Sequence, residues 1–298
     1  MDTAHQGRVL LPAELLDTVV YWLLVKRPAF SSIAAFTLTS HQCRQIALRR
    51  YYSTLHVRSA PHWVRSCHIP GMFIWVRSLS APTTVFRYKM DGLASFTSLR
   101  ALELDFSGDG LSTQASRAML LFKNMTAALT RMKLTHLPRI DSSLLSLAAS
   151  RFPTLVTLEL SCVERLDEHC CWLCYEESST CCAHSPIPGV YATVDSLLSD
   201  FLKVLKPLER LETLFLGIFL SDADVLACHL ERCAAVIMAS PRTGYYPAPP
   251  FGPNKCAVCC AEHGVATRAR ELRAKAAIAA AIPSIQSVGF SSWFPLGQ

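Results

Sequence analysis

One apolar spacing recurs through most of the chain and constrains its fold more than any other feature. The spacing is apolar-x-x-apolar-x-apolar, and it is cleanest in "LVTLEL" and "LETLFL". Its last two apolar positions lie two residues apart, which is the period of a strand with one face on a core. Each copy therefore predicts a short strand. The six copies are Val76/Leu79/Ala81, Leu99/Leu102/Leu104, Leu129/Met132/Leu134, Leu155/Leu158/Leu160, Leu211/Leu214/Leu216 and a weaker Ile285/Val288/Phe290.

The distances between these copies favour a repeat protein. Successive copies start 23, 30 and 26 residues apart, and then 56 and 74 residues apart. The first three distances lie in or near the leucine-rich-repeat range of about 20–29 residues. A short strand and one helix cannot bury their apolar faces alone, whereas stacked copies share a continuous core. We therefore expect an α/β fold in residues 53–298, a leucine-rich-repeat solenoid with parallel strands and outer helices. An ordinary α/β domain with parallel strands is the alternative, because "LxxLxL" is common there too.

Helical segments are expected between the strands, together with two insertions. Asp141 and Asp222 are expected N-caps of two of these helices, because an aspartate side chain can accept a first-turn N–H. The insertions span 161–192 and 238–264, and prolines make the second irregular. Long loops in repeat proteins often bind partners. The expected helices span 113–125, 141–152, 193–208, 222–233 and 266–282.

The first fifty residues predict three short helices followed by a strand at 53–59. The first helix lies in "LLPAELLDTVVYWLLV", with Pro12 in its first turn, where the missing N–H costs nothing. The other two span 31–40 and 41–52. The opening segment is shorter than the roughly 18 apolar residues of a membrane span. Glu14 and Asp17 interrupt it, and no small-residue cleavage site follows. We therefore expect no membrane association and a cytoplasmic or nuclear location.

The segment "LLPAELLDTVVYWLLV…FSSIAAFTLTSHQCRQIA" resembles an F-box. That motif opens with Leu-Pro-x-Glu and continues through an apolar helix, a short helix and an Arg-rich helix. Cys43 stands where the family often has Trp. Together with the repeats, the chain resembles an F-box/leucine-rich-repeat protein of the fungal type. The matching residues are Leu11, Pro12, Glu14, Leu15, Leu16, Val19, Leu23, Ile33, Phe36, Leu38, Ser40, Arg44 and Ala47.

The resemblance implies a non-catalytic substrate-receptor subunit of a Skp–cullin–F-box type ubiquitin ligase. Residues 8–52 would bind a Skp-type adaptor, and residues 53–298 would bind a protein substrate that the sequence does not identify. The implied adaptor-binding residues are Leu11, Pro12, Leu15, Leu16 and Val19.

A second hypothesis is a stand-alone leucine-rich-repeat scaffold for protein interactions, whose N-terminal helices only cap the solenoid. The two hypotheses differ in where the apolar surface of the first helix lies. A cap would bury Val19, Val20, Leu23 and Leu24 internally. An F-box would leave the adaptor-binding residues partly exposed as a patch.

Other activities receive little support from the sequence. The formal net charge of +6 is spread along the chain, without the clustered basic and aromatic residues of a nucleic-acid site. The 12 glycines are scattered and form no phosphate-binding loop. No segment resembles a nucleophile motif with a base and an orienting group. We therefore expect neither an enzyme nor a nucleic-acid-binding protein.

Thirteen cysteines are many for a chain of this kind. In a reducing compartment we expect free thiols and no cofactor. Zinc binding is the more specific alternative. Cys171-x-x-Cys174 and Cys256-x-x-Cys259 have a zinc-ligand spacing, one in each insertion. The two pairs could meet and form a four-ligand site that fastens both loops. Neither pair has a second CxxC at the usual distance, so free thiols are the favoured interpretation.

Overall fold

The computed structural model describes residues 11–86, 90–162, 187, 190–221, 225–229, 232–233 and 256–292. Its centre is a seven-stranded sheet in which every strand is parallel to its neighbour and the spatial order equals the chain order. This confirms the expected α/β class and the parallel strands. The strands are β1 Thr54–His56, β2 Ser78–Pro82, β3 Ala101–Asp105, β4 Arg131–Leu137, β5 Thr157–Cys162, β6 Thr213–Gly217 and β7 Ser287–Phe290.

The recurring apolar spacing explains the register of this sheet. The second apolar position of each copy pairs with the same position of the next copy, so that Leu102 lies beside Met132 and Leu158 beside Leu214. The third position forms a parallel row, in which Leu134 lies beside Leu160. From β2 to β6 both rows are buried. A one-residue slip would turn these rows away from the core, so the pattern fixes the register.

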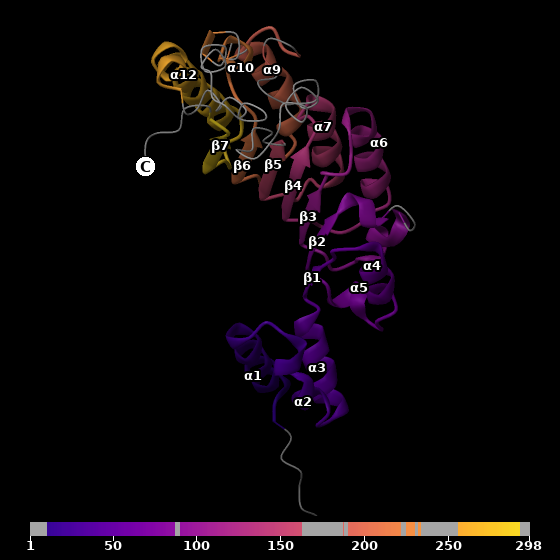
Figure 1. Ribbon diagram of the computed structural model, residues 1–298. Helices are drawn as coiled ribbons and strands as arrows, with labels where there is room; N and C mark the ends of the chain where they lie inside the picture. The colour runs from indigo at the N-terminus through magenta and orange to yellow at the C-terminus, as the bar shows by residue number, and fades with distance from the viewer. Residues whose placement is uncertain are drawn as a thin grey trace, which may run out of the picture.

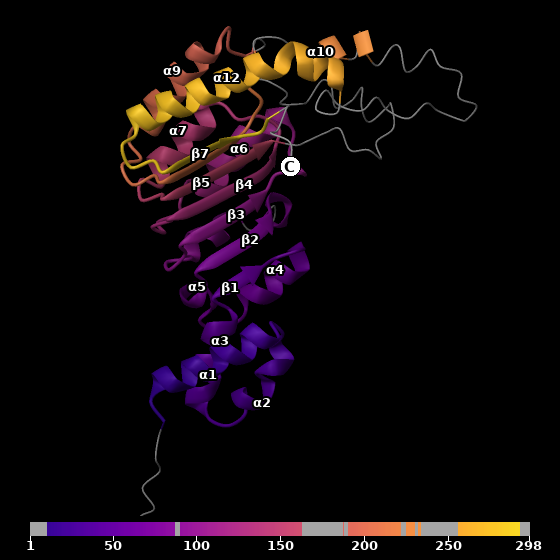
Figure 2. The ribbon, with the colours of Figure 1, turned by 90° about the vertical axis from the view of Figure 1, so that its left-hand side faces the viewer.

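The described helices that connect the strands lie along one face of the sheet, as Figures 1 and 2 show from two directions. The main core lies between these helices and the two apolar rows. Of the described helical segments, four short ones lie between β1 and β3 along the chain, and five helices follow β3. They are α4 Ala60–Cys67, α5 Met72–Trp75, η2 Thr83–Phe86, η3 Met90–Ser95, α6 Leu111–Phe122, α7 Ser142–Arg151, α9 Val194–Leu205, α10 Val225–His229 and α12 Ala257–Ala281.

Most predicted helices are present close to their expected bounds. Asp141 caps α7 as expected, because its carboxylate accepts the backbone N–H of Leu144 at 3.0 Å. The other expected cap, Asp222, lies outside the described residues. The helix expected to start at residue 266 begins at Ala257, so it includes residues that the sequence assigned to the second insertion. Alanines and other residues that favour helices continue the segment in both directions.

The N-terminal helices form a separate group beside β1 (Figure 1). They are α1 Ala13–Lys26, α2 Ala34–Thr37 and α3 His41–Tyr51, with a 3₁₀ turn η1 at Phe30–Ser32. The expected second helix is thus a 3₁₀ turn followed by a single α-turn. Val20, Ile33 and Ala47 form a small core of their own, distinct from the main core. Tyr52, which follows α3, packs against the main core and joins the two parts.

In the part of the chain that the structure describes, no helix combines the length and the apolar character needed to cross a bilayer.

Candidate functional sites

The first candidate site is the outer face of α1. Leu11, Leu15 and Val19 are 55%, 53% and 47% exposed, and Pro12 is exposed beside them. Leu15 and Val19 are four residues apart and therefore lie on the same side of the helix. Leu16, the remaining predicted adaptor-binding residue, is buried at 8% exposure. Four of the five predicted residues are thus accessible, and Leu16 supports the helix from inside.

Sequence reasoning did not select Trp22, which at 58% exposure is the most exposed large apolar residue of α1. It follows Leu15 by seven residues and Val19 by three, so it continues the same side of the helix. Tyr21 contacts Trp22 edge to face, with ring centroids 5.3 Å apart. The Arg50 guanidinium lies 4.9 Å from the centroid of the Tyr21 ring. The sequence contained a signal that the exposed apolar surface extends to Trp22, because α1 is apolar on nearly every side.

The opposite side of α1 is used inside the helical group. Val20 is fully buried, and Leu23 and Leu24 are half-buried against Ile33 and its neighbours. A cap would bury Val19 together with these residues, but Val19 is 47% exposed. The helix therefore separates into an inner side that holds the group together and an outer apolar side.

Cys43, the residue expected to depart from the F-box pattern, lies in the first turn of α3. Its backbone N–H donates to the Ser40 hydroxyl at 3.1 Å, so the residue takes part in the helix cap. Its side chain is half-buried, and it does not belong to the buried centre of the group.

The second candidate site is the face of the sheet opposite the described helices. One row of side chains crosses it in register: Ser80 lies beside Glu103, Glu103 beside Lys133, and Lys133 beside Glu159. Lys133 Nζ and Glu103 Oε1 are 3.4 Å apart. The row continues to Phe215, within a hollow of about 440 Å³. A polar surface of alternating charge with an aromatic group suits a protein or peptide ligand.

A second hollow of about 500 Å³ lies on the same face toward β1. Asp105 and His136 contribute to it, and the His136 Nδ1 and Asp105 Oδ1 atoms are 2.9 Å apart. His136 has a positive φ of 52° at a shift in the pairing of β4 with β5. The left-handed conformation aims this imidazole across the open face toward β3.

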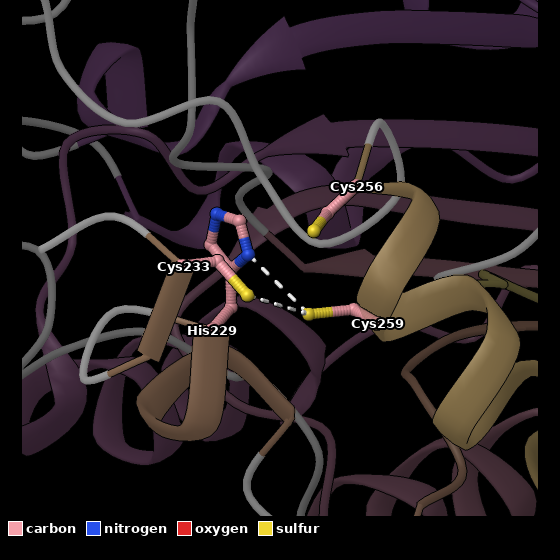
Figure 3. Close-up of side chains that lie close together, drawn as sticks. All are labelled: His229, Cys233, Cys256 and Cys259. Carbon is pink, nitrogen blue, oxygen red and sulfur yellow. Dashed lines mark hydrogen bonds between the residues drawn. The ribbon is translucent and has the colours of Figure 1, made fainter. Parts of the chain in front are cut away.

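The third candidate site is a cluster of His229, Cys233, Cys256 and Cys259, whose ligand atoms all lie within 4.8 Å of one another. His229 ends α10 and Cys233 follows it by four residues, while Cys256 precedes α12 and Cys259 lies in its first turn. Figure 3 shows the four side chains converging from these two segments. His229 and Cys259 are fully buried, and Cys256 nearly so.

The expected zinc ligands are only partly present in this cluster. Cys256 and Cys259 belong to it, whereas Cys171 and Cys174 lie outside the described residues. Sequence reasoning missed His229 and Cys233. Their i, i+4 spacing within the helix expected at 222–233 was the available signal, because it places both side chains on one side of the helix.

The thiols of the cluster differ in acidity. Burial, together with the neighbouring Cys256 and Cys233 sulfurs, raises the pKa of Cys259 to about 12. Burial also opposes ionisation of Cys256, but hydrogen bonds from the backbone N–H groups of Cys259 and Val258 and from the Cys259 and Cys233 thiols outweigh it and lower the pKa of Cys256. Cys256 therefore loses its proton before Cys259, as expected for a sulfur at the positive end of a helix.

Comparison of the sequence with models of known protein families finds no matching family, and comparison with curated proteins finds no matching protein.

Proposed function

We propose that this protein is a non-catalytic substrate-receptor subunit of a Skp–cullin–F-box type ubiquitin ligase. Residues 8–52 would act as the F-box and bind a Skp-type adaptor. Residues 53–298 would form a degenerate leucine-rich-repeat solenoid that binds a protein substrate. The exposed outer side of α1, formed by Leu11, Pro12, Leu15 and Val19, is the observation that carries this proposal.

The packing of the N-terminal helices supports an adaptor site over a simple cap. A cap is expected to bury its apolar surface against the end of the sheet. Here the helical group has its own core around Val20 and Ile33, and Tyr52, just after α3, packs against the main core. Large apolar side chains remain on the outer side of α1. An exposed apolar row on a helix that already has an internal core is typical of a protein interface.

The stacked strand and helix units support the solenoid assignment. The strands follow chain order without crossing over one another, and the same apolar positions form rows from β2 to β6. In such an arrangement the face without outer helices is the usual ligand surface. We place substrate binding on the row of Glu103, Lys133, Glu159 and Phe215. Its mixed charges would select a partner with complementary charges.

The proposal is tested by mixing the full chain with a purified Skp-type adaptor and measuring affinity by calorimetry. The wild-type chain is expected to bind at micromolar concentration or better. Leu15→Asp places a charge on the outer side of α1 and is expected to weaken binding at least about tenfold, because burying an unpaired charge costs more than about 1.4 kcal/mol.

Val265→Asp is the matched control, since Val265 is 82% exposed on α12, far from α1 along the chain. It is expected to leave adaptor binding unchanged. Circular dichroism should show that both variants are folded. Absence of adaptor binding by the wild-type chain would refute the receptor function and leave the stand-alone scaffold. Equal losses in the two variants would refute the assignment of the site to α1.

A further inference from the structure

We propose that His229, Cys233, Cys256 and Cys259 form a structural zinc centre that fastens the α10 segment to the N-terminal end of α12. This site is independent of the adaptor-binding surface. The chain supplies the ligands as two pairs, His229-x-x-x-Cys233 and Cys256-x-x-Cys259. Short spacing within a pair and a long connection between pairs is the usual arrangement of tetrahedral zinc sites.

The distances within the cluster fit one small cation. With Zn–S bonds of about 2.3 Å and Zn–N bonds of about 2.0–2.1 Å, a tetrahedral centre places two sulfurs about 3.8 Å apart and a sulfur and a nitrogen about 3.6 Å apart. The Sγ atoms of Cys233 and Cys259 are 3.8 Å apart, and Cys259 Sγ lies 3.4 Å from His229 Nδ1. Both values match edges of such a tetrahedron. Figure 3 marks these two contacts.

The same distances exclude a disulfide between the two closest cysteines. A disulfide requires an S–S distance of about 2.05 Å, whereas the Cys233 and Cys259 sulfurs are separated by 3.8 Å. All three cysteines of the cluster are free thiols. Their sulfurs therefore remain available as metal ligands.

Packing alone gives this region little stability. The local apolar cluster consists of Val225, Cys256 and Cys259, with Phe219 and Cys233 against it, and it is separate from the main core. Most of its members are thus the candidate ligands themselves. Small units with so little apolar surface are commonly stabilised by a metal or a disulfide. A metal here would hold the chain on both sides of residues 234–255.

The ligand types favour zinc over other common metals. Thiolates and imidazole are soft and borderline ligands, which suit zinc. Magnesium and calcium prefer oxygen ligands, so this set does not favour them. Four protein ligands complete a tetrahedral shell and leave no position for water or substrate. The centre would therefore be structural. The N-terminal end of α12, with its partial positive charge, would offset part of the negative charge of three thiolates bound to one Zn²⁺.

Metal content is the direct test. The full chain is produced with zinc in the medium, purified in a non-thiol reductant, washed with a mild chelator and measured by elemental analysis. We expect about one zinc per chain, and at least a fivefold lower content in Cys259→Ser and in His229→Ala. Cys260→Ser is the matched control, because Cys260 is the neighbouring exposed thiol outside the cluster. It is expected to retain the metal, as is the double variant Cys171→Ser/Cys174→Ser.

A second measurement covers the case in which ligand variants fail to fold. The wild-type chain is loaded with Co²⁺, and its absorption spectrum reports the coordination geometry and the number of bound thiolates. A tetrahedral spectrum with three thiolates is expected. Hydrogen exchange should show that a strong chelator exposes residues 225–229 and 256–265 and leaves α7 protected.

Four results would overturn the zinc centre: a wild-type chain without zinc, a cobalt spectrum with four thiolates, equal metal loss in Cys259→Ser and Cys260→Ser, or loss of metal in the Cys171/Cys174 double variant. The first would leave a cluster of hydrogen-bonded thiols. The others would place the metal on a different set of ligands.

Discussion

Asp141 tests how strongly an N-terminal cap stabilises α7. Its carboxylate accepts the Leu144 backbone N–H at 3.0 Å and the Ser143 hydroxyl at 2.6 Å. The Arg139 guanidinium lies 3.0 Å away, and the carboxylate is largely buried. The helix that it caps, α7, is packed between α6 and α9 in the middle of the molecule. Loss of this cap should therefore destabilise the whole sheet domain.

The expected cost of Asp141→Ala follows from these contacts. Replacing an N-cap aspartate by alanine costs about 0.5–2 kcal/mol. The ion pair with Arg139 is half-exposed on the arginine side and adds up to about 1 kcal/mol. We expect a loss of about 2 kcal/mol in the free energy of unfolding. Asp141→Asn keeps an oxygen for the Leu144 N–H and should cost about 1 kcal/mol or less.

The charge of Asp141 also predicts a dependence on pH. Burial alone would raise its pKa, but the hydrogen bonds from Ser143 and Leu144 and the charge of Arg139 outweigh burial and lower the pKa. The folded-state pKa is then below the unfolded value of about 3.9. Stability from this group is complete above the unfolded pKa and is lost as the pH falls through the folded pKa. The difference between wild type and Asp141→Asn should be constant from pH 7 to 5 and shrink below about pH 4.

Urea denaturation followed by circular dichroism at pH 7, 5 and 3.5 measures these differences. Asp200→Ala is the control, because the Asp200 side chain is about half exposed on α9 and, among the contacts described for it, pairs only with Lys203, at 3.4 Å. It should change stability by less than about 0.5 kcal/mol. A capping role of Asp141 is refuted if Asp141→Ala costs no more than Asp200→Ala, or if the stability difference between wild type and Asp141→Asn widens at low pH.

Two further substitutions test the packing of the sheet by the same denaturation assay. Leu158 is fully buried between Met132 and Leu214, so Leu158→Ala should lower the free energy of unfolding by about 2–5 kcal/mol. Thr157 is half-buried and is the control. An equal loss in Thr157→Ala would contradict the buried apolar rows. A Cβ on Gly217 would lie 2.7 Å from Ser161 Cα and 2.9 Å from Leu160 O, so Gly217→Ala should cost about 1–3 kcal/mol. A Cβ on Gly110 meets nothing within 4 Å, so Gly110→Ser is the control and should not lower stability. Similar losses at both glycines would show that the close approach of β5 to Gly217 is not the cause.

The sequence by itself determined the parallel α/β sheet and most of its register. Residues such as Leu102, Leu134 and Leu158 lie in a recurring pattern whose period of two is that of a strand with one face on a core. These are local properties, because each strand pairs with the strands next to it in the chain. The cap at Asp141 was predictable for the same reason, since a helix cap depends on a few consecutive residues.

Only the tertiary structure decided which side of α1 remains open and which cysteines meet. Because α1 is apolar almost all round, its periodicity does not distinguish Leu15, which is exposed, from Leu16, which is buried. That choice depends on where α2 and α3 pack. Likewise, Cys256 and Cys259 meet His229 and Cys233 because α10 packs against the start of α12. The spacing of cysteines along a chain does not specify a contact between segments so far apart in the sequence, whereas the packing of α10 against α12 does.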